Sequence, residues 1–186
     1  MKKIGLITFH GSNNCGSMLQ AFALQKKIYD LGYTSTIINF SSRGQRDLYS
    51  IMPSFFLNGH FRKSQVKLWF LCIPFKNILK KENFDYKSFQ SKYFVMTDKE
   101  YYDNESLCNE DFDFDVYITG SDQVWNINCV DADDAYFLNF VKQGKKIAYA
   151  TSLGANDIKK TSCNPDKYVN YLKSFDFISV REMNAV

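Results

Sequence analysis

The chain has 186 residues, the length of one ordinary domain, and its 45% hydrophobic and 17% aromatic residues are ample for a buried core. Its 23 basic and 20 acidic residues are spread along the chain, which argues against the basic stripe of a nucleic-acid-binding protein. The five cysteines are scattered and form no C-x-x-C pair, so neither a disulfide framework nor a metal site is expected, and a reducing cytoplasm suits them.

The first forty residues predict a β-α-β unit. Residues 4–9 form a short apolar run, typical of a strand that is covered on both faces of a parallel sheet. Residues 17–31 carry apolar side chains at three- and four-residue spacing and are followed by Gly32, where a helix C-cap glycine belongs. A second β-branched run covers 35–40, and the crossover between the two strands should be right-handed.

Residues 41–109 mix aromatic side chains with Lys and Arg and predict an irregular insertion that contains a helix near 86–94. The longest apolar run of the chain, 68–75, is far below the roughly 20 residues that span a bilayer. The simpler interpretation is that this insertion packs over one edge of the core. The alternative is peripheral contact with a membrane, since Trp, Phe and Lys suit a lipid interface.

The regular pattern resumes with apolar runs at 114–119, 145–152 and 175–180, and a helix is expected to begin near Pro165. Strands separated by helices predict a single α/β domain over 1–186, with a Rossmann-like doubly wound parallel sheet. The chain stops six residues after Val180, where a further element is expected. A cut gene or expression product, or a missing second domain, would account for that.

The loop after the first predicted strand is rich in glycine and amide side chains. Its small residues should leave backbone N–H groups exposed at the positive end of the following helix, which suits a phosphate or carboxylate. The competing interpretation is that Asn14 or Ser17 only caps that helix. The candidate substrate-binding residues of this region are His10, Asn13, Asn14, Gly16 and Gln20.

Two further loops follow predicted strands. In "TGSDQVWN", Gly120 permits a sharp turn, Asp122 places a carboxylate at the rim, and Trp125 offers a flat apolar wall of the kind that sugars stack against. The competing interpretation makes Ser121 or Asp122 a helix cap and Trp125 a core residue. Asp122 is the candidate catalytic residue. The other candidates for substrate binding here are Gly120, Ser121, Gln123 and Trp125, with Ser152 and Gly154 in the loop "ATSLGAN".

Arg181 directly follows the last predicted strand and is well placed to bind an anion in a bidentate manner. An internal salt bridge with Glu182 is the simpler explanation. The carboxyl ends of parallel strands meet at one edge of a doubly wound sheet. We therefore expect all of these loops to gather at that edge.

Five segments in order resemble the polysaccharide pyruvyl transferase family: "ITFHGSNNCGSMLQAFALQ", "FDVYITGSDQVWN", "AYFLNFV", "KKIAYATSLG" and "FISVRE". The insertion shows no clear match. The resemblance implies one half of a two-domain fold similar to GT-B glycosyltransferases. It also implies transfer of pyruvate from phosphoenolpyruvate, as donor substrate and without a cofactor, onto a sugar or lipid-linked saccharide of a cell-surface polysaccharide, as a ketal.

Family members are roughly twice as long, and their carboxyl-terminal half supplies an Arg and His cluster that would clamp the donor. This chain should therefore form the acceptor wall, with Asn13, Asn14, Asp122 and Trp125, and be inactive alone. The alternative is a non-catalytic remnant or a sugar- or nucleotide-binding module that pairs with another chain, or dimerises, over its open side. An unrelated nucleotide-binding domain is a weaker option, because the G-x-G-x-x-G pattern is missing.

Overall fold

The computed structural model describes residues 2–52, 56–57, 60–61, 63–154 and 157–182. Five parallel strands form one sheet in the order β2-β1-β5-β6-β7. They are β1 (Lys3–Ile7), β2 (Thr34–Ile37), β5 (Val116–Asp122), β6 (Lys145–Thr151) and β7 (Phe177–Val180). This order is a doubly wound arrangement that reverses direction between β1 and β5. The predicted Rossmann-like α/β fold is confirmed.

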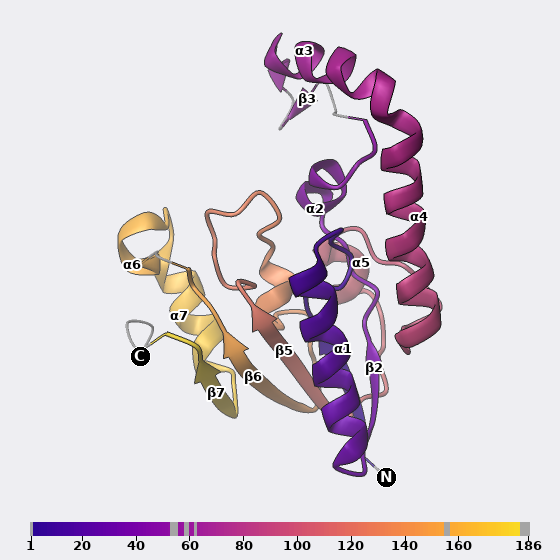
Figure 1. Ribbon diagram of the computed structural model, residues 1–186. Coiled ribbons are helices and arrows are strands. Elements are labelled where there is room, and N and C mark those ends of the chain that lie inside the picture. Colours follow the sequence, from indigo (N-terminus) through magenta and orange to yellow (C-terminus); the bar gives the residue numbers. More distant parts are fainter. Residues whose placement is uncertain (1, 53–55, 58–59, 62, 155–156, 183–186) are drawn as a thin grey trace.

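Helices and 3-10 turns cover both faces of this sheet, and Figure 1 shows α1 and α4 on one side of it. A separate pair, β3 (Phe56–Leu57) and β4 (His60–Phe61), is antiparallel. The helices are α1 (Cys15–Asp30), α2 (Arg43–Leu48), α3 (Lys63–Cys72), α4 (Lys76–Tyr93), α5 (Asn104–Cys108), α6 (Ile158–Thr161) and α7 (Pro165–Lys173), and the 3-10 turns are η1 (Ile73–Phe75) and η2 (Asp134–Phe137).

Successive side chains of the strands belong to two apolar clusters, one on each face of the sheet. Ile4 and Leu6 of β1 join Met18 and Ala21 of α1 in the first cluster. The neighbouring Ile7 belongs to the second cluster, which lies under η2, α5 and α7. Because successive side chains of a strand point to opposite faces, the nearly continuous apolar run at 4–9 serves both layers.

The first helix begins and ends where its chemistry requires. Asn14 is the N-cap, and its side chain accepts hydrogen bonds from the backbone N–H groups of Gly16 and Ser17 at 2.8 and 3.3 Å. At the other end Leu31 is the C-cap, and Gly32 follows with a φ of 85°, a conformation that glycine adopts without a steric penalty. The predicted helix boundaries therefore hold to within two residues.

The segment 41–109 is more regular than the sequence pattern indicated, because it contains α2, α3, α4 and α5. The carboxyl-terminal half of α4 packs on α1, where the ring of Phe89 lies 6.1 Å from that of Phe22. The chain after α4 then runs beside β2, with the N–H of Ile37 donating to the carbonyl of Val95 at 2.8 Å. The first half of α4 and α3 extend past the top of the sheet in Figure 1.

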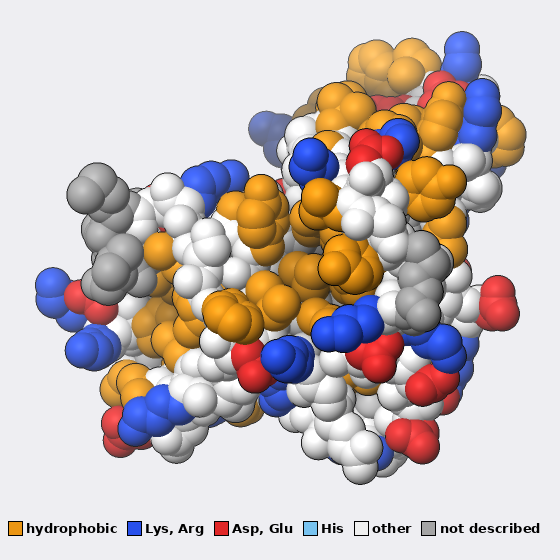
Figure 2. All heavy atoms as spheres, turned by 90° about the horizontal axis from the view of Figure 1, so that it is seen from below, with side chains coloured by type: hydrophobic (Ala, Val, Ile, Leu, Met, Phe, Trp, Pro, Cys, Tyr) orange, Lys and Arg blue, Asp and Glu red, His pale blue; other side chains and the backbone are white. Residues whose placement is uncertain are grey.

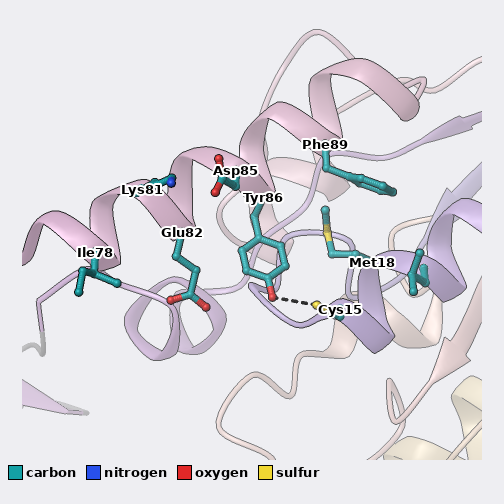
Figure 3. Close-up of a pocket in the computed structure, with 9 residues that line it drawn as sticks. Cys15, Met18, Ile78, Lys81, Glu82, Asp85, Tyr86 and Phe89 are labelled. Atoms are coloured by element: carbon teal, nitrogen blue, oxygen red, sulfur yellow. Dashed lines mark hydrogen bonds between the residues drawn. The ribbon is translucent and has the colours of Figure 1, made fainter. Parts of the chain in front are cut away.

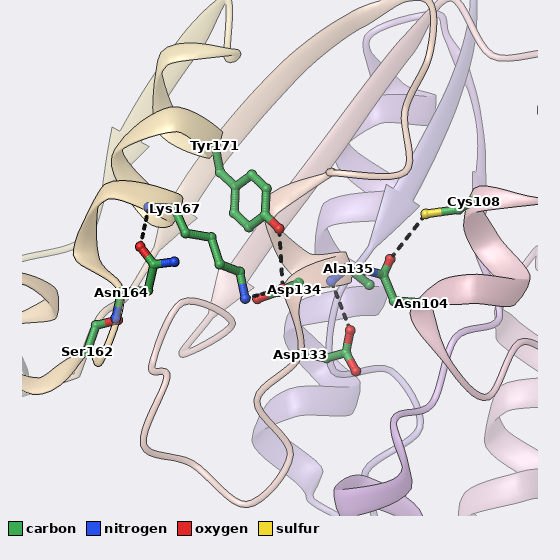
Figure 4. A network of polar contacts seen from close by, with 9 residues as sticks. All are labelled: Asn104, Cys108, Asp133, Asp134, Ala135, Ser162, Asn164, Lys167 and Tyr171. Atoms are coloured by element: carbon green, nitrogen blue, oxygen red, sulfur yellow. Dashed lines mark hydrogen bonds and ion pairs between the residues drawn. The ribbon is translucent and has the colours of Figure 1, made fainter.

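A polar network fixes α7 against η2 (Figure 4). Lys167 forms an ion pair with Asp134, and the Tyr171 hydroxyl donates to the same carboxylate at 3.3 Å. Each element also carries its own cap: Asn164 accepts from the N–H of Lys167, and Asp133 accepts from that of Ala135. This network holds the cover of the second cluster beside the β5 and β6 loops.

Candidate functional site

The predicted loops meet at the carboxyl edge of the sheet, at the point between β1 and β5 where strand order reverses. In open α/β sheets this reversal opens a crevice in which ligands bind. The Ser17 hydroxyl, on the first turn of α1, donates to Asp122 Oδ2 at 2.7 Å although 105 positions separate the two residues. The expectation that these loops gather at one edge is therefore met.

Asp122 is the best-positioned carboxylate at this edge. Its Oδ1 accepts a hydrogen bond from the N–H of Gln123 at 2.8 Å, while Oδ2 is held by Ser17. Its φ of 113° is a conformation that residues other than glycine rarely adopt, and such residues concentrate at functional sites. Each carboxylate oxygen has a second lone pair, so the group can accept further hydrogen bonds from a half-exposed position.

A chain of hydrogen bonds ties the crevice walls together. Gln20 of α1 donates from Nε2 to Thr8 Oγ1 at 2.8 Å, and the Thr8 hydroxyl donates to the carbonyl of Ser121 at 3.0 Å. These contacts join α1, the end of β1 and the end of β5. Gln20 Oε1 is buried and has no hydrogen-bond partner among the described residues, so an unsatisfied acceptor lies behind the crevice wall.

The β6 and β7 ends complete the rim. Ser152 accepts the N–H of Gly154 at 3.0 Å and donates its hydroxyl to Glu182. Arg181 Nε lies 3.6 Å from Glu182 Oε1, so the simpler interpretation of Arg181 as a salt-bridge partner agrees with the structure. Gly154 lies beside Asn126, and the N–H of Trp125 donates to the Ser152 carbonyl at 3.2 Å, so the β5 and β6 loops are in contact.

Burial corrects three predicted roles. Ser152 is fully buried and its hydroxyl is bonded to Gly154 and Glu182, so it is a structural residue of the rim and does not contact a substrate. Trp125 is 2% exposed, with its ring stacked on Phe137 and its Nε1 donating to the carbonyl of Tyr136 at 3.0 Å, so it is a core residue and offers no wall to a sugar. His10 is 1% exposed and does not face the crevice. Its ring nitrogens contact the Thr8 carbonyl and Asn39 Oδ1, each at 3.1 Å.

The predicted anion site at the start of α1 is also corrected in part. The N–H groups of Gly16 and Ser17 already bind the Asn14 side chain, so they are not free for a phosphate. Asn13 lies half-buried in the same loop and Asn14 is exposed. The amide-rich loop therefore caps α1 and places Ser17 beside Asp122.

Residues that sequence analysis missed lie between α2 and the loop after β5. Ser42, the N-cap of α2, donates its hydroxyl to the Asp131 carbonyl at 3.2 Å. Burial, with the charge of Asp122 adding to it, raises the pKa of Asp131. Burial, followed by the charge of Asp131, raises the pKa of Tyr49. Asp131 and Tyr49 are thus titratable neighbours of the crevice, and no strand-end rule places them there because both lie well away from strand ends in the sequence.

A cavity of about 650 Å³ opens between the start of α1 and the middle of α4 (Figure 3). At its rim the Tyr86 hydroxyl and Cys15 Sγ are 3.2 Å apart, and this contact, with burial, raises the pKa of Tyr86 to about 12. Cys15 begins the helical turn that carries Ser17, so the cavity lies beside the crevice. Its lining is Cys15, Met18, Leu19, Ile78, Lys81, Glu82, Asp85, Tyr86 and Phe89.

The described residues hold no group of three or more His, Cys, Asp or Glu side chains arranged to bind a metal ion. Each cysteine is a free thiol. Figure 2 shows the opposite end of the molecule, where the strands begin, and basic, acidic and hydrophobic side chains are interspersed there. The hydrogen bonds that join distant loops, such as those of Asp122 and Thr8, lie at the other end of the sheet, at the crevice edge.

His10 is expected to make folding stability depend on pH. Burial lowers its pKa, with the contacts to Asn39 and Thr8 offsetting only part of that effect. The unfolded chain then binds a proton that the folded protein does not, so stability should fall as pH drops below about 6.5, by up to about 1.4 kcal/mol per pH unit. Urea unfolding of the wild type and of His10→Gln at pH 7.5 and 5.5 measures this difference.

The comparison with His10→Gln is needed because Asp131 and Asp133, whose pKa values are raised by burial, change stability in the opposite direction on acidification. An identical pH dependence in the two proteins would show that folding does not lower the pKa of His10. Direct titration of the imidazole by NMR provides an independent check.

A family model described as polysaccharide pyruvyl transferase matches residues 14–185. Comparison with curated proteins gives no significant match, and neither does comparison with solved structures. The matched range includes Ser17, Asp122 and the ends of β5, β6 and β7, and the end of β1 precedes it. By this match over most of its length, the chain belongs to the polysaccharide pyruvyl transferase family.

Proposed function

We propose that the crevice between β1 and β5 binds the saccharide acceptor of a reaction that moves pyruvate from phosphoenolpyruvate onto a sugar of a cell-surface polysaccharide. The observation that supports this most directly is the Asp122 carboxylate, held at the strand-order reversal by Ser17 and the N–H of Gln123. Sugar hydroxyls are hydrogen-bond donors, and a fixed carboxylate is a strong acceptor for them.

The proposed chemistry assigns one role to Asp122. Ketal formation requires a proton on the methylene carbon of phosphoenolpyruvate, attack by two sugar hydroxyls on the adjacent carbon, and departure of phosphate. A base must accept the hydroxyl protons, and a carboxylate within hydrogen-bond reach of those hydroxyls can do so. We assign this base to Asp122, with Gln20 and Gln123 as neighbours that orient the sugar.

The charge of the rim suggests how the donor is held. Asp122, Asp131 and Glu182 are acidic, and the one guanidinium of these strand-end loops, Arg181, lies beside Glu182. Phosphoenolpyruvate carries a carboxylate and a phosphate, which require cationic partners. We therefore propose that the donor is bound by a second, basic surface facing this rim, and that turnover depends on that surface.

Acceptor binding tests the proposal. Saturation-transfer NMR and calorimetry with a panel of hexoses, N-acetylhexosamines and their oligosaccharides should detect at least one ligand for the wild type. The Asp122→Asn variant is expected to bind that ligand about tenfold or more weakly, because hydrogen bonds to a charged acceptor are lost. Asp113→Asn is the matched control, since its side chain is 91% exposed and it precedes the start of β5, at the end of the strand opposite Asp122.

Phosphate release from phosphoenolpyruvate in the presence of the bound saccharide separates an enzyme from a binding module. Release that requires both substrates supports the transferase. Saccharide binding without release, in a protein that also carries the second, basic surface, favours the non-catalytic alternative. If a folded wild type binds none of the saccharides, or if Asp122→Asn binds them as well as the wild type does, the crevice is not an acceptor site.

A further inference from the structure

An arm formed by α3, η1 and the first half of α4, residues 63–84, extends beyond the sheet (Figure 1). Large apolar side chains remain exposed along it. Neither η1 nor α4 contains a buried residue. The most exposed apolar side chains are Phe70, Phe75, Ile78 and Phe84, at 63, 57, 64 and 68%, and Leu68, Leu71 and Ile73 are exposed as well.

Exposed apolar residues that stand singly are ordinary, whereas a run of seven within 17 positions marks an interaction surface. The part of α4 that follows the arm packs on the body of the protein, through residues such as Tyr86 and Phe89. The arm therefore presents a surface that packing within the described residues does not use.

Most of the arm lies in a basic stretch of the chain, residues 48–81, which Glu82 follows. Residues 48–81 contain six of the 23 basic residues and none of the 20 acidic ones. The other 152 residues therefore contain 17 basic and 20 acidic side chains, a net charge of −3 against +6 for this stretch. On the arm, Lys67, Lys76, Lys80 and Lys81 are exposed among the apolar side chains.

We propose that the arm docks on the surface of an anionic lipid bilayer, with its apolar side chains in the headgroup region and its lysines against lipid phosphates. Basic charge combined with exposed aromatic and aliphatic side chains is the pattern of interfacial helices. No described helix is long and apolar enough to cross a membrane, so the contact would be peripheral.

Charge argues against a second copy of this chain as the occupant. A symmetric dimer would place this surface against itself, and the arm, with five lysines and one acidic residue, Glu82, would repel its own copy. An anionic bilayer offers the opposite charge over a wide area. This inference does not depend on the proposed function, since it concerns other residues and is tested without any saccharide.

Vesicle sedimentation tests the docking, with phosphatidylcholine alone and phosphatidylcholine mixed with phosphatidylglycerol in equal parts. We expect the wild type to bind the anionic vesicles and to be released by salt. The triple variant Lys76→Gln, Lys80→Gln and Lys81→Gln should bind them about 100-fold more weakly, at about 1 kcal/mol per lysine. The control variant Lys142→Gln, Lys159→Gln and Lys173→Gln has the same net charge and should bind as the wild type does.

A second pair of variants tests the apolar contribution. Phe75→Ser with Ile78→Ser should reduce binding at least tenfold, whereas Leu31→Ser, which removes an equally exposed apolar side chain from the end of α1, should leave it unchanged. Circular dichroism verifies that each variant is folded. Equal binding to both vesicle types, equal loss in the control variants, or no vesicle binding would overturn the proposal. Self-association through the arm, measured by sedimentation velocity, would also overturn it.

Discussion

Replacement of Trp125 by alanine is expected to lower the free energy of unfolding by about 3–5 kcal/mol, the range for deleting a large aromatic side chain from a packed core. The indole stacks on Phe137 with ring centroids 5.4 Å apart and meets the edge of Phe175 at 5.5 Å. Its Nε1 also donates to the Tyr136 carbonyl, which the Thr119 hydroxyl shares. The alanine variant loses the ring contacts and one of those two donors.

Urea unfolding measures this effect, and Trp125→Phe is the matched control. Phenylalanine keeps most of the ring volume and loses the Nε1 donor, so it should cost about 1–2 kcal/mol. In a Trp69→Phe background, the single remaining indole should also resist quenching by iodide. A cost below about 0.5 kcal/mol for Trp125→Ala, together with efficient quenching, would show that Trp125 lies at the surface, as a sugar-stacking residue would.

Trp125 also shows where residue type stops being informative. A tryptophan just after a strand suits a ligand wall and a core position equally well in the sequence. Trp125 is a core residue because Phe137, from η2, and Phe175, from the turn after α7, pack against the indole. Nothing within a few residues of position 125 reveals those partners, so the wrong role was predicted.

The strands and the first helix were predictable because their signals are local. Apolar runs identified β1, β2, β5, β6 and β7, and the cap chemistry of Asn14 and Gly32 bounded α1. The gathering of the loops followed from the rule for carboxyl ends of parallel strands. The pairing of Ser17 with Asp122 could not be predicted beyond that rule, since it depends on the register between β1 and β5 and on the first turn of α1.

The insertion was harder to predict because distant contacts shape it. A helix was expected near 86–94, whereas α4 begins at Lys76. The first half of α4 has no apolar face packed on the core, so its sequence lacks the amphipathic spacing that marks a buried helix. The segment after α4 runs beside β2 through Ile37 and Met96, a pairing across about sixty residues that no local pattern encodes.

Replacement of Gly120 by alanine should cost about 3 kcal/mol or more and disturb the crevice as well. A Cβ atom there would lie 2.2 Å from the Tyr149 carbonyl oxygen of the adjacent strand β6, and this backbone atom cannot rotate away. The φ of Gly120 is 108°, which disfavours alanine independently of the overlap. Asp122 follows two residues later and its carbonyl accepts the N–H of Ser152 at 3.0 Å. A displacement of β6 would therefore move Asp122, the candidate catalytic residue.

Gly32→Ala separates the cost of the positive φ from the cost of the overlap with the Tyr149 carbonyl. Gly32 has a φ of 85°, yet nothing lies within 4 Å of an added Cβ atom, so alanine there carries the backbone cost alone, about 1–2 kcal/mol. The difference between the two variants in urea unfolding gives the cost of pressing β5 against β6, which we expect to be about 2 kcal/mol. Saccharide affinity should fall in Gly120→Ala and not in Gly32→Ala, because only the former lies on the strand that carries Asp122. Equal stability losses in the two variants would mean that β6 yields without resistance, and the close approach of the two strands would then not be what fixes Asp122 at the rim.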